Sequence, residues 1–157
     1  MVYILLADGF EEIEALTPID YLRRAGVRRA GIKVSSVGIT GKKVIGTHKI
    51  EVTADLLPEQ VNREEMDMLV LPGGMPGTTN LEKDSFVQDL VAYAVENKIP
   101  VAAICAAPQV LGHKGYLKGK RAVCYPGFES ELLGAKVEEN NSVVIDGNFI
   151  TAKSAGV

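Results

Sequence analysis

One cysteine stands where a short apolar run gives way to small residues. Cys105 follows the run at residues 101–104 and precedes Ala106 and Ala107. At the end of a buried strand, a cysteine faces the free N–H groups of the next helix, which favour a thiolate and lower the thiol pKa from about 8.5. The position predicts a reactive nucleophile at Cys105, although a buried core cysteine fits the same pattern.

Glycine and proline gather in residues 71–77, at the end of another apolar run. The backbone N–H groups of such a turn, at Gly73 and Gly74, can bind an oxyanion beside a nucleophile. The turn is not a phosphate-binding loop, because no Gly-Lys-Ser/Thr sequence follows it. If this strand neighbours the strand of Cys105, both ends meet at one edge of a parallel sheet.

Three glutamates follow the first apolar run of the chain. Glu11 and Glu12 fit an acidic first turn of a helix, where the helix dipole favours negative charge. Glu14 lies deeper, and a carboxyl in an apolar crevice keeps its proton and can donate a hydrogen bond to a thiolate. We therefore expect Glu14 to be the acid partner of Cys105.

Neither histidine fits the role of a base beside Cys105. His113 comes later in the same expected helix, ~12 Å away along the axis, and is expected to face solvent. His48 lies in a glycine-punctuated, exposed hairpin, from which it reaches a site only across a subunit boundary.

Apolar runs alternate with helical patterns, which is typical of βα units around a parallel sheet buried on both faces. We expect helices over residues 11–24, with a bend at Pro18, over residues 85–97, capped by Asp84, and from Cys105 or just after. A hairpin is expected over residues 41–52. Strands are expected over residues 2–7, 32–37, 66–71, 101–104, 120–125, 142–145 and 148–152.

Composition excludes several classes of protein. The 157 residues suffice for one domain, expected to span residues 1–157. Hydrophobic residues make up 46% and the net charge is −3, so no nucleic-acid partner is expected. The first apolar run is too short for export or membrane spanning, so we expect a cytoplasmic protein with free thiols. No metal or cofactor is expected from two cysteines outside any zinc-binding spacing.

Two segments are unusual. A basic repeat at residues 23–27 and 28–32 fits a solvated surface patch. The last residues, 150–157, resemble a strand that enters a helix, but no helix follows them. We therefore expect that a C-terminal helix is missing or that a partner covers one apolar face of the sheet.

The motifs at residues 8–14, 71–74 and 103–108, in this order and spacing, resemble the PfpI/ThiJ superfamily. The most similar branch is that of the Parkinsonism-associated protein deglycase and its bacterial relatives. This resemblance implies a flavodoxin-like α/β domain of the class I glutamine amidotransferase type, with a doubly wound, mostly parallel sheet sandwiched by helices. It also implies a homodimer.

The same resemblance implies roles for individual residues. Cys105 would be the nucleophile and Glu14 the protonated acid bonded to it. The N–H groups of Gly74 and Ala106 would form an anion pocket, next to Gly73. Tyr125 and, from a second subunit, His48 would contribute to substrate binding.

The resemblance leaves several activities open. Members act as glyoxalases or deglycases on methylglyoxal and its glycated adducts, without a cofactor. Others are linked to oxidative stress, as sensors that form cysteine sulfinate or as chaperones, or to thiazole monophosphate biosynthesis. An amidase or protease is the last alternative, since only His113 follows the cysteine.

The chain departs from the family pattern at three places. Ala106 stands where protease-like members have histidine, which argues against a peptidase. Tyr125 stands where some members have histidine before proline, and a phenol of pKa ~10 is a poor proton shuttle near neutral pH. Lys153 and its neighbours replace a Ser-Arg-Gly-Pro-Gly run.

Overall fold

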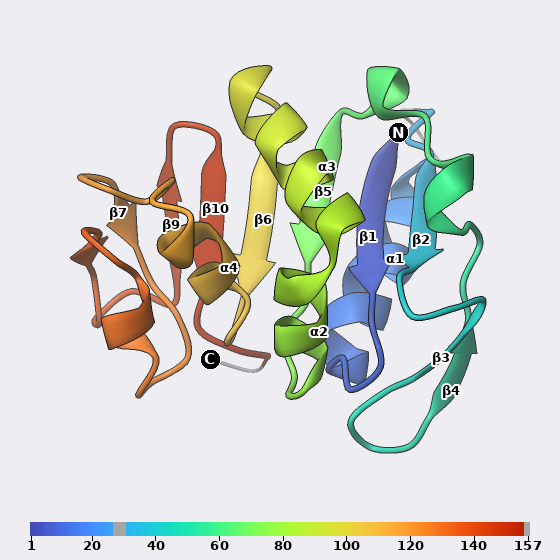
Figure 1. The fold of residues 1–157 in the computed structure, drawn as a ribbon, viewed down its shortest axis with the longest axis horizontal. Coiled ribbons are helices and arrows are strands. Elements are labelled where there is room, and N and C mark those ends of the chain that lie inside the picture. The colour runs from blue at the N-terminus through green and yellow to red at the C-terminus, as the bar shows by residue number, and fades with distance from the viewer. Residues whose placement is uncertain (27–30, 156–157) are drawn as a thin grey trace.

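A six-stranded sheet forms the centre of the computed structural model, which describes residues 1–26 and 31–155 (Figure 1). The basic repeat of the sequence lies partly outside these residues. The strand order is β2-β1-β5-β6-β10-β9. The strands are β1 (Val2–Leu6), β2 (Val34–Gly38), β5 (Met68–Leu71), β6 (Val101–Ile104), β9 (Val143–Asp146) and β10 (Phe149–Ala152).

All neighbouring pairs in this sheet are parallel except β10 with β9. When its parallel strands are counted along the chain, their order is 2-1-3-4-5, the flavodoxin-like arrangement. The expected fold class is therefore confirmed. In this arrangement the strand order reverses between β1 and β5, and the crevice beyond their carboxyl ends is where such folds bind ligands.

Strand β1 is buried on both faces of the sheet. Tyr3 and Leu5 pack into one apolar core, while Val2, Ile4 and Leu6 pack into the other. This explains why the strand reads as a continuous apolar run rather than an alternating one.

Helices cover the two faces unequally (Figure 1). The α1 helix (Glu12–Ala25) lies on one face and continues through Pro18, where a bend was expected. The other face carries α2 (Gly77–Lys83), α3 (Ser85–Glu96) and α4 (Pro108–His113). Asp84 caps α3 as expected, since its side chain accepts a hydrogen bond from the N–H of Val87.

On the α1 side, part of the sheet is open to solvent. An apolar groove of about 370 Å³ runs between α1 and strands β5, β6 and β10, and Glu14 lies at one side of it. The helices of the described residues are too short or too polar to span a lipid bilayer.

Several expected elements differ from the structure. The hairpin is present as β3 (Lys43–Ile45) and β4 (Glu51–Thr53), but α2 was not predicted, because Gly77 and the threonines after it are poor helix formers. The strand expected over residues 120–125 is only β7 (Arg121–Ala122), which pairs with β8 (Lys136–Val137). It ends there because the N–H of Val123 donates instead to the Thr151 hydroxyl. Short 3₁₀ turns, η2 (Pro58–Gln60), η3 (Arg63–Glu65) and η4 (Glu129–Glu131), complete the chain.

His113 connects three of these elements. Its Nδ1 contacts the Glu82 carboxylate of α2, and its Nε2 lies 2.7 Å from the Glu131 carboxylate of η4. The hydrogen bond to Glu82, more than that to Glu131, raises the pKa of His113 above its usual range. The imidazolium therefore clamps α2, α4 and η4 together.

This clamp makes stability depend on pH. Because the folded-state pKa of His113 is raised, its contribution is complete below the unfolded pKa of about 6.5 and is lost as the pH rises through the folded value. We expect His113→Gln to lower the free energy of unfolding by about 0.5–1 kcal/mol at pH 5.5, as for a partly exposed ion pair. Urea unfolding should show the difference shrinking toward pH 9, and a constant difference would contradict the clamp.

Candidate functional site

Three loops meet at the carboxyl edge of the sheet. They follow β1, β5 and β6. The first leads into α1, which carries Glu14, and the other two contain the Gly73-Gly74 turn and Cys105. The β1 and β6 strands both pair with β5, so the three loops are adjacent. The structure thus brings together the residues expected to form one site.

Cys105 occupies a strained turn between β6 and α4. Its φ is 63°, in the left-handed region that costs a side-chain-bearing residue roughly 1–2 kcal/mol. Two hydrogen bonds hold the turn: the Cys105 N–H donates to the Ala152 carbonyl at 3.0 Å, and the Tyr125 N–H donates to the Cys105 carbonyl at 2.8 Å. The turn aims the half-buried thiol into the crevice.

Glu14 reaches the thiol from the first turn of α1. Its carboxyl is buried beside Cys105 and accepts hydrogen bonds from the Gly73 N–H at 2.9 Å and the Ala155 N–H at 3.4 Å. The N–H groups of Gly74 and Ala106 lie near enough to the Cys105 sulfur to favour its thiolate and lower the pKa. The carboxyl therefore has two backbone donors of its own, and two other N–H groups lie near the sulfur.

Burial raises the pKa of both members of the pair. Burial, more than the nearby charge of Glu11, raises the pKa of Glu14 above its usual range. Burial and then the negative charge of Glu14 raise the pKa of Cys105 to about 11, against the opposing pull of the Gly74 and Ala106 N–H groups. The expectation that a helix N-terminus lowers the thiol pKa is therefore wrong, because α4 begins only at Pro108 and burial dominates.

Residue 73 must be glycine for this pair to meet. A Cβ atom there would lie 2.5 Å from the Cys105 Cβ and 2.7 Å from Glu14 Oε2. Gly74 adopts a φ of 88°, which turns its N–H toward the sulfur, and a Cβ would lie 2.6 Å from the Gly9 carbonyl oxygen. The two glycines allow backbone and side chains to approach more closely than any other residue would.

Two other residues singled out in the sequence, Tyr125 and Lys153, differ in their relation to Cys105. Tyr125 contacts Cys105 through its backbone, and its exposed ring packs edge-to-face on Phe128 with centroids 6.3 Å apart. Lys153 instead lines a separate cavity of about 160 Å³ with the buried Cys124. Burial raises the pKa of Cys124 to about 12, so this thiol stays protonated.

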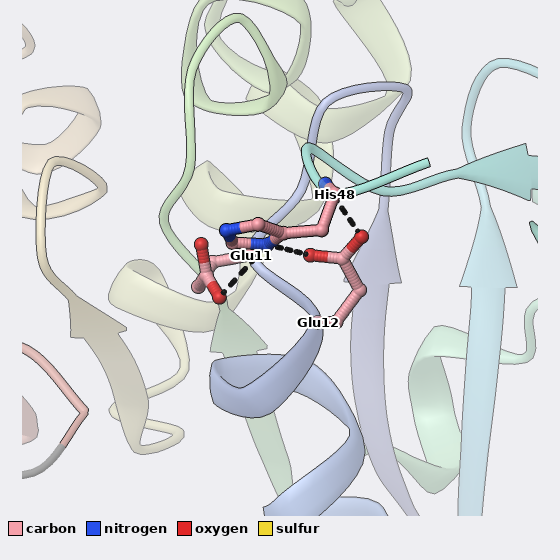
Figure 2. A group of neighbouring side chains, drawn as sticks. All are labelled: Glu11, Glu12 and His48. Atoms are coloured by element: carbon pink, nitrogen blue, oxygen red, sulfur yellow. Dashed lines mark hydrogen bonds and ion pairs between the residues drawn. The ribbon is translucent and has the colours of Figure 1, made fainter. Parts of the chain in front are cut away.

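His48, which was expected to reach the Cys105 site only from a second subunit, lies beside Glu11 and Glu12 in its own chain. Its ring lies over the N-terminus of α1 in its own chain, between Glu11 and Glu12 (Figure 2). His48 Nδ1 is 2.8 Å from Glu12 Oε2 and 3.6 Å from Glu11 Oε1. The hydrogen bond that the His48 ring donates to the Glu12 carboxylate is the largest cause of the raised pKa of His48.

Glu12 has a structural role that sequence reasoning missed. Its carboxylate is buried and accepts a hydrogen bond from the His48 N–H at 2.7 Å, which fixes the turn between β3 and β4. Burial alone would raise the pKa of Glu12, but the bonds from His48 outweigh it and lower the pKa. Nothing in the spacing of the chain signals this contact, because the partners are 36 residues apart.

The close approach at residue 73 can be tested by adding one methyl group. Gly73→Ala should move Glu14 away from Cys105, remove part of the charge that raises the thiol pKa, and lower the pH midpoint of Cys105 alkylation. Overpacking should also cost about 1–3 kcal/mol in the free energy of unfolding. The control is Gly115→Ala, whose φ is 76° but whose surroundings are open, and it should leave the midpoint unchanged. An unchanged midpoint in Gly73→Ala would contradict the geometry.

Known proteins share this architecture. The model of the DJ-1/PfpI family matches residues 1–157. A deglycase of Pyrococcus abyssi is 36% identical over 99% of this chain and 90% of that protein. Protein DJ-1 homolog B of Arabidopsis thaliana is 33% identical over 99% of this chain, which spans only 34% of that protein. The crystal structure of Drosophila melanogaster DJ-1beta superposes with a TM-score of 0.90, at 35% identity over 99% of this chain and 82% of that one. The chain belongs to the DJ-1/PfpI family.

Proposed function

We propose that the chain is a cysteine-dependent enzyme of the glyoxalase or deglycase type, acting on methylglyoxal or its adducts. The observation that carries this proposal is the juxtaposition of Cys105 and the buried Glu14 carboxyl at Gly73, with the Gly74 and Ala106 N–H groups near the sulfur. Relatives named deglycase, at 33–36% identity over nearly the whole chain, support a role of this type.

The first step joins the thiol to the aldehyde carbon. As the S–C bond forms, Glu14 takes the thiol proton as general base, a role favoured by its raised pKa. The carbonyl oxygen gains negative charge next to the Gly74 and Ala106 N–H groups, which stabilise it. Transfer of the proton from Glu14 to that oxygen gives a neutral hemithioacetal on Cys105.

The second stage converts the hemithioacetal into product. Glu14 removes the proton from the former aldehyde carbon and returns a proton to the neighbouring carbonyl carbon, while the hydroxyl proton of the hemithioacetal passes to the oxygen of that second carbon. A thioester of the 2-hydroxy acid results. Water then attacks the thioester, and the Cys105 sulfur leaves and regains its proton. The sum is methylglyoxal plus water giving lactate, with no external oxidant or reductant. Reversal of a glycated adduct would use the same thiol and base.

A redox-sensing role uses the same thiol and is the second candidate. Cys105 is half-buried, whereas Cys124 is only 2% exposed, so a peroxide reaches Cys105 first. The N–H groups on the Cys105 sulfur would also stabilise the oxygens of a sulfinate. An amidase is not favoured, because His113 is held between Glu82 and Glu131.

Lactate formation from methylglyoxal tests the enzymatic proposal. We expect Cys105→Ala to lose at least about 100-fold in kcat/KM, because removal of a covalent nucleophile removes the reaction path. Glu14→Gln should lose activity mainly in kcat, since the amide cannot accept the proton. Cys124→Ala is the matched control and should retain activity.

Two results would contradict the enzymatic proposal. One is full turnover by Cys105→Ala. The other is a wild-type protein that forms no lactate and releases no glycated adduct, yet gains two oxygen atoms at Cys105 alone under mild peroxide, as judged by intact mass. The second result would establish the sensing role instead.

A further inference from the structure

We propose that Glu11, Glu12 and His48 form a binding site for a zinc-type divalent metal ion, at the N-terminus of α1. One nitrogen of His48 and one oxygen of each carboxylate all lie within 4.8 Å of one another. The three side chains come from two segments, the start of α1 and the turn between β3 and β4 (Figure 2). The site was not expected from the sequence, because Glu12 and His48 are 36 residues apart along the chain.

Both carboxylates approach the same ring nitrogen. Glu12 Oε2 and Glu11 Oε1 lie 2.8 Å and 3.6 Å from His48 Nδ1. A proton on Nδ1 makes a good hydrogen bond to only one of these oxygens, whereas a cation between the three atoms would have the nitrogen and both oxygens as its ligands. Tetrahedral zinc bonds of about 2.0–2.2 Å place neighbouring ligand atoms about 3.4 Å apart. A bound ion would therefore widen the 2.8 Å contact of His48 with Glu12 and slightly shorten the 3.6 Å contact with Glu11.

The ligands are held in place by contacts outside the cluster. The Glu12 side chain is only 5% exposed, and its Oε1 accepts from the His48 N–H at 2.7 Å, which leaves Oε2 directed at the ring. The Glu11 N–H donates to the Gly73 carbonyl at 2.9 Å, and the Thr47 N–H donates to the Phe10 carbonyl at 2.8 Å. Such outer contacts orient metal ligands and strengthen binding.

The second histidine of the chain does not bring two carboxylates to the same ring nitrogen. His113 also contacts two carboxylates, but Glu82 lies at Nδ1 and Glu131 at Nε2, on opposite sides of the ring. No single ion can bind both carboxylates and one nitrogen there. His113 is therefore the matched control for His48.

The donor set selects the class of metal. One imidazole and two carboxylates suit Zn²⁺ and similar transition-metal ions, whereas Ca²⁺ and Mg²⁺ prefer oxygen ligands alone. The His48 side chain is 66% exposed, so water can reach the remaining coordination position. The site is distinct from the Cys105 thiol and needs neither cysteine.

Competition between the protein and a chromogenic zinc chelator tests the proposal. We expect the full chain, with Cys105 and Cys124 both replaced by serine, to bind one equivalent of Zn²⁺. In that background, His48→Ala and Glu11→Gln should each weaken binding at least tenfold, and His113→Gln should not change it. Glu12 is left unaltered because it also fixes the hairpin. X-ray absorption of the zinc-loaded wild-type protein should show nitrogen and oxygen ligands at about 2.0–2.1 Å and no sulfur at about 2.3 Å.

Three results would overturn the proposal. The first is equal zinc binding by His48→Ala, Glu11→Gln and the parent protein. The second is loss of zinc binding when the two cysteines are replaced, together with zinc–sulfur scattering in the wild type. The third is weakening by His113→Gln as large as that by His48→Ala. Thermal unfolding in the presence of a chelator checks that each variant is folded. If His48→Ala is unfolded, the zinc affinity of Glu11→Gln decides the question.

Discussion

The whole site depends on one close contact, in which the backbone of Gly73 approaches both Cys105 and Glu14. Gly73 lies where any Cβ would overlap both the thiol-bearing residue and the carboxyl. Three parallel strands bring their carboxyl ends to this place, at the switch point of the sheet. The backbone of the sheet and its loops therefore holds the nucleophile, Cys105, and the base, Glu14, next to each other.

The strain at Cys105 belongs to the same arrangement. A left-handed cysteine costs roughly 1–2 kcal/mol, and its turn persists because β10 and the segment after β7 each supply one hydrogen bond to its backbone. Those bonds link the site to the neighbouring strand β10 and to the segment that contains Tyr125. The thiol can thus be half-buried and still stand at the crevice, with Glu14 on one side and two N–H groups on the other.

The sequence predicted the local elements better than the contacts between them. The apolar runs of β1, β5 and β6 identify buried strands, and the turn at Gly73 together with Cys105 identifies the edge at which the site lies. Glu14 could be chosen over Glu11 because it lies further into the helix. The sequence predicted a protonated Glu14 beside a Cys105 thiolate, whereas burial raises the pKa of the thiol to about 11. Spacing along the chain does not reveal how deeply a side chain is buried. The pairing of Glu12 with His48 and the helix α2 were missed, because both depend on tertiary packing rather than on local pattern.

The central claim is that Cys105 and Glu14 share a proton, with the charge of Glu14 raising the pKa of the thiol. The most direct measurement is the pH dependence of Cys105 alkylation, in a Cys124→Ser background so that one thiol reports. The structure predicts an alkaline midpoint, near the value of about 11, that Glu14→Gln shifts to lower pH by removing the negative charge. A parent midpoint below neutrality, or one that Glu14→Gln leaves unchanged or raises, would contradict the account.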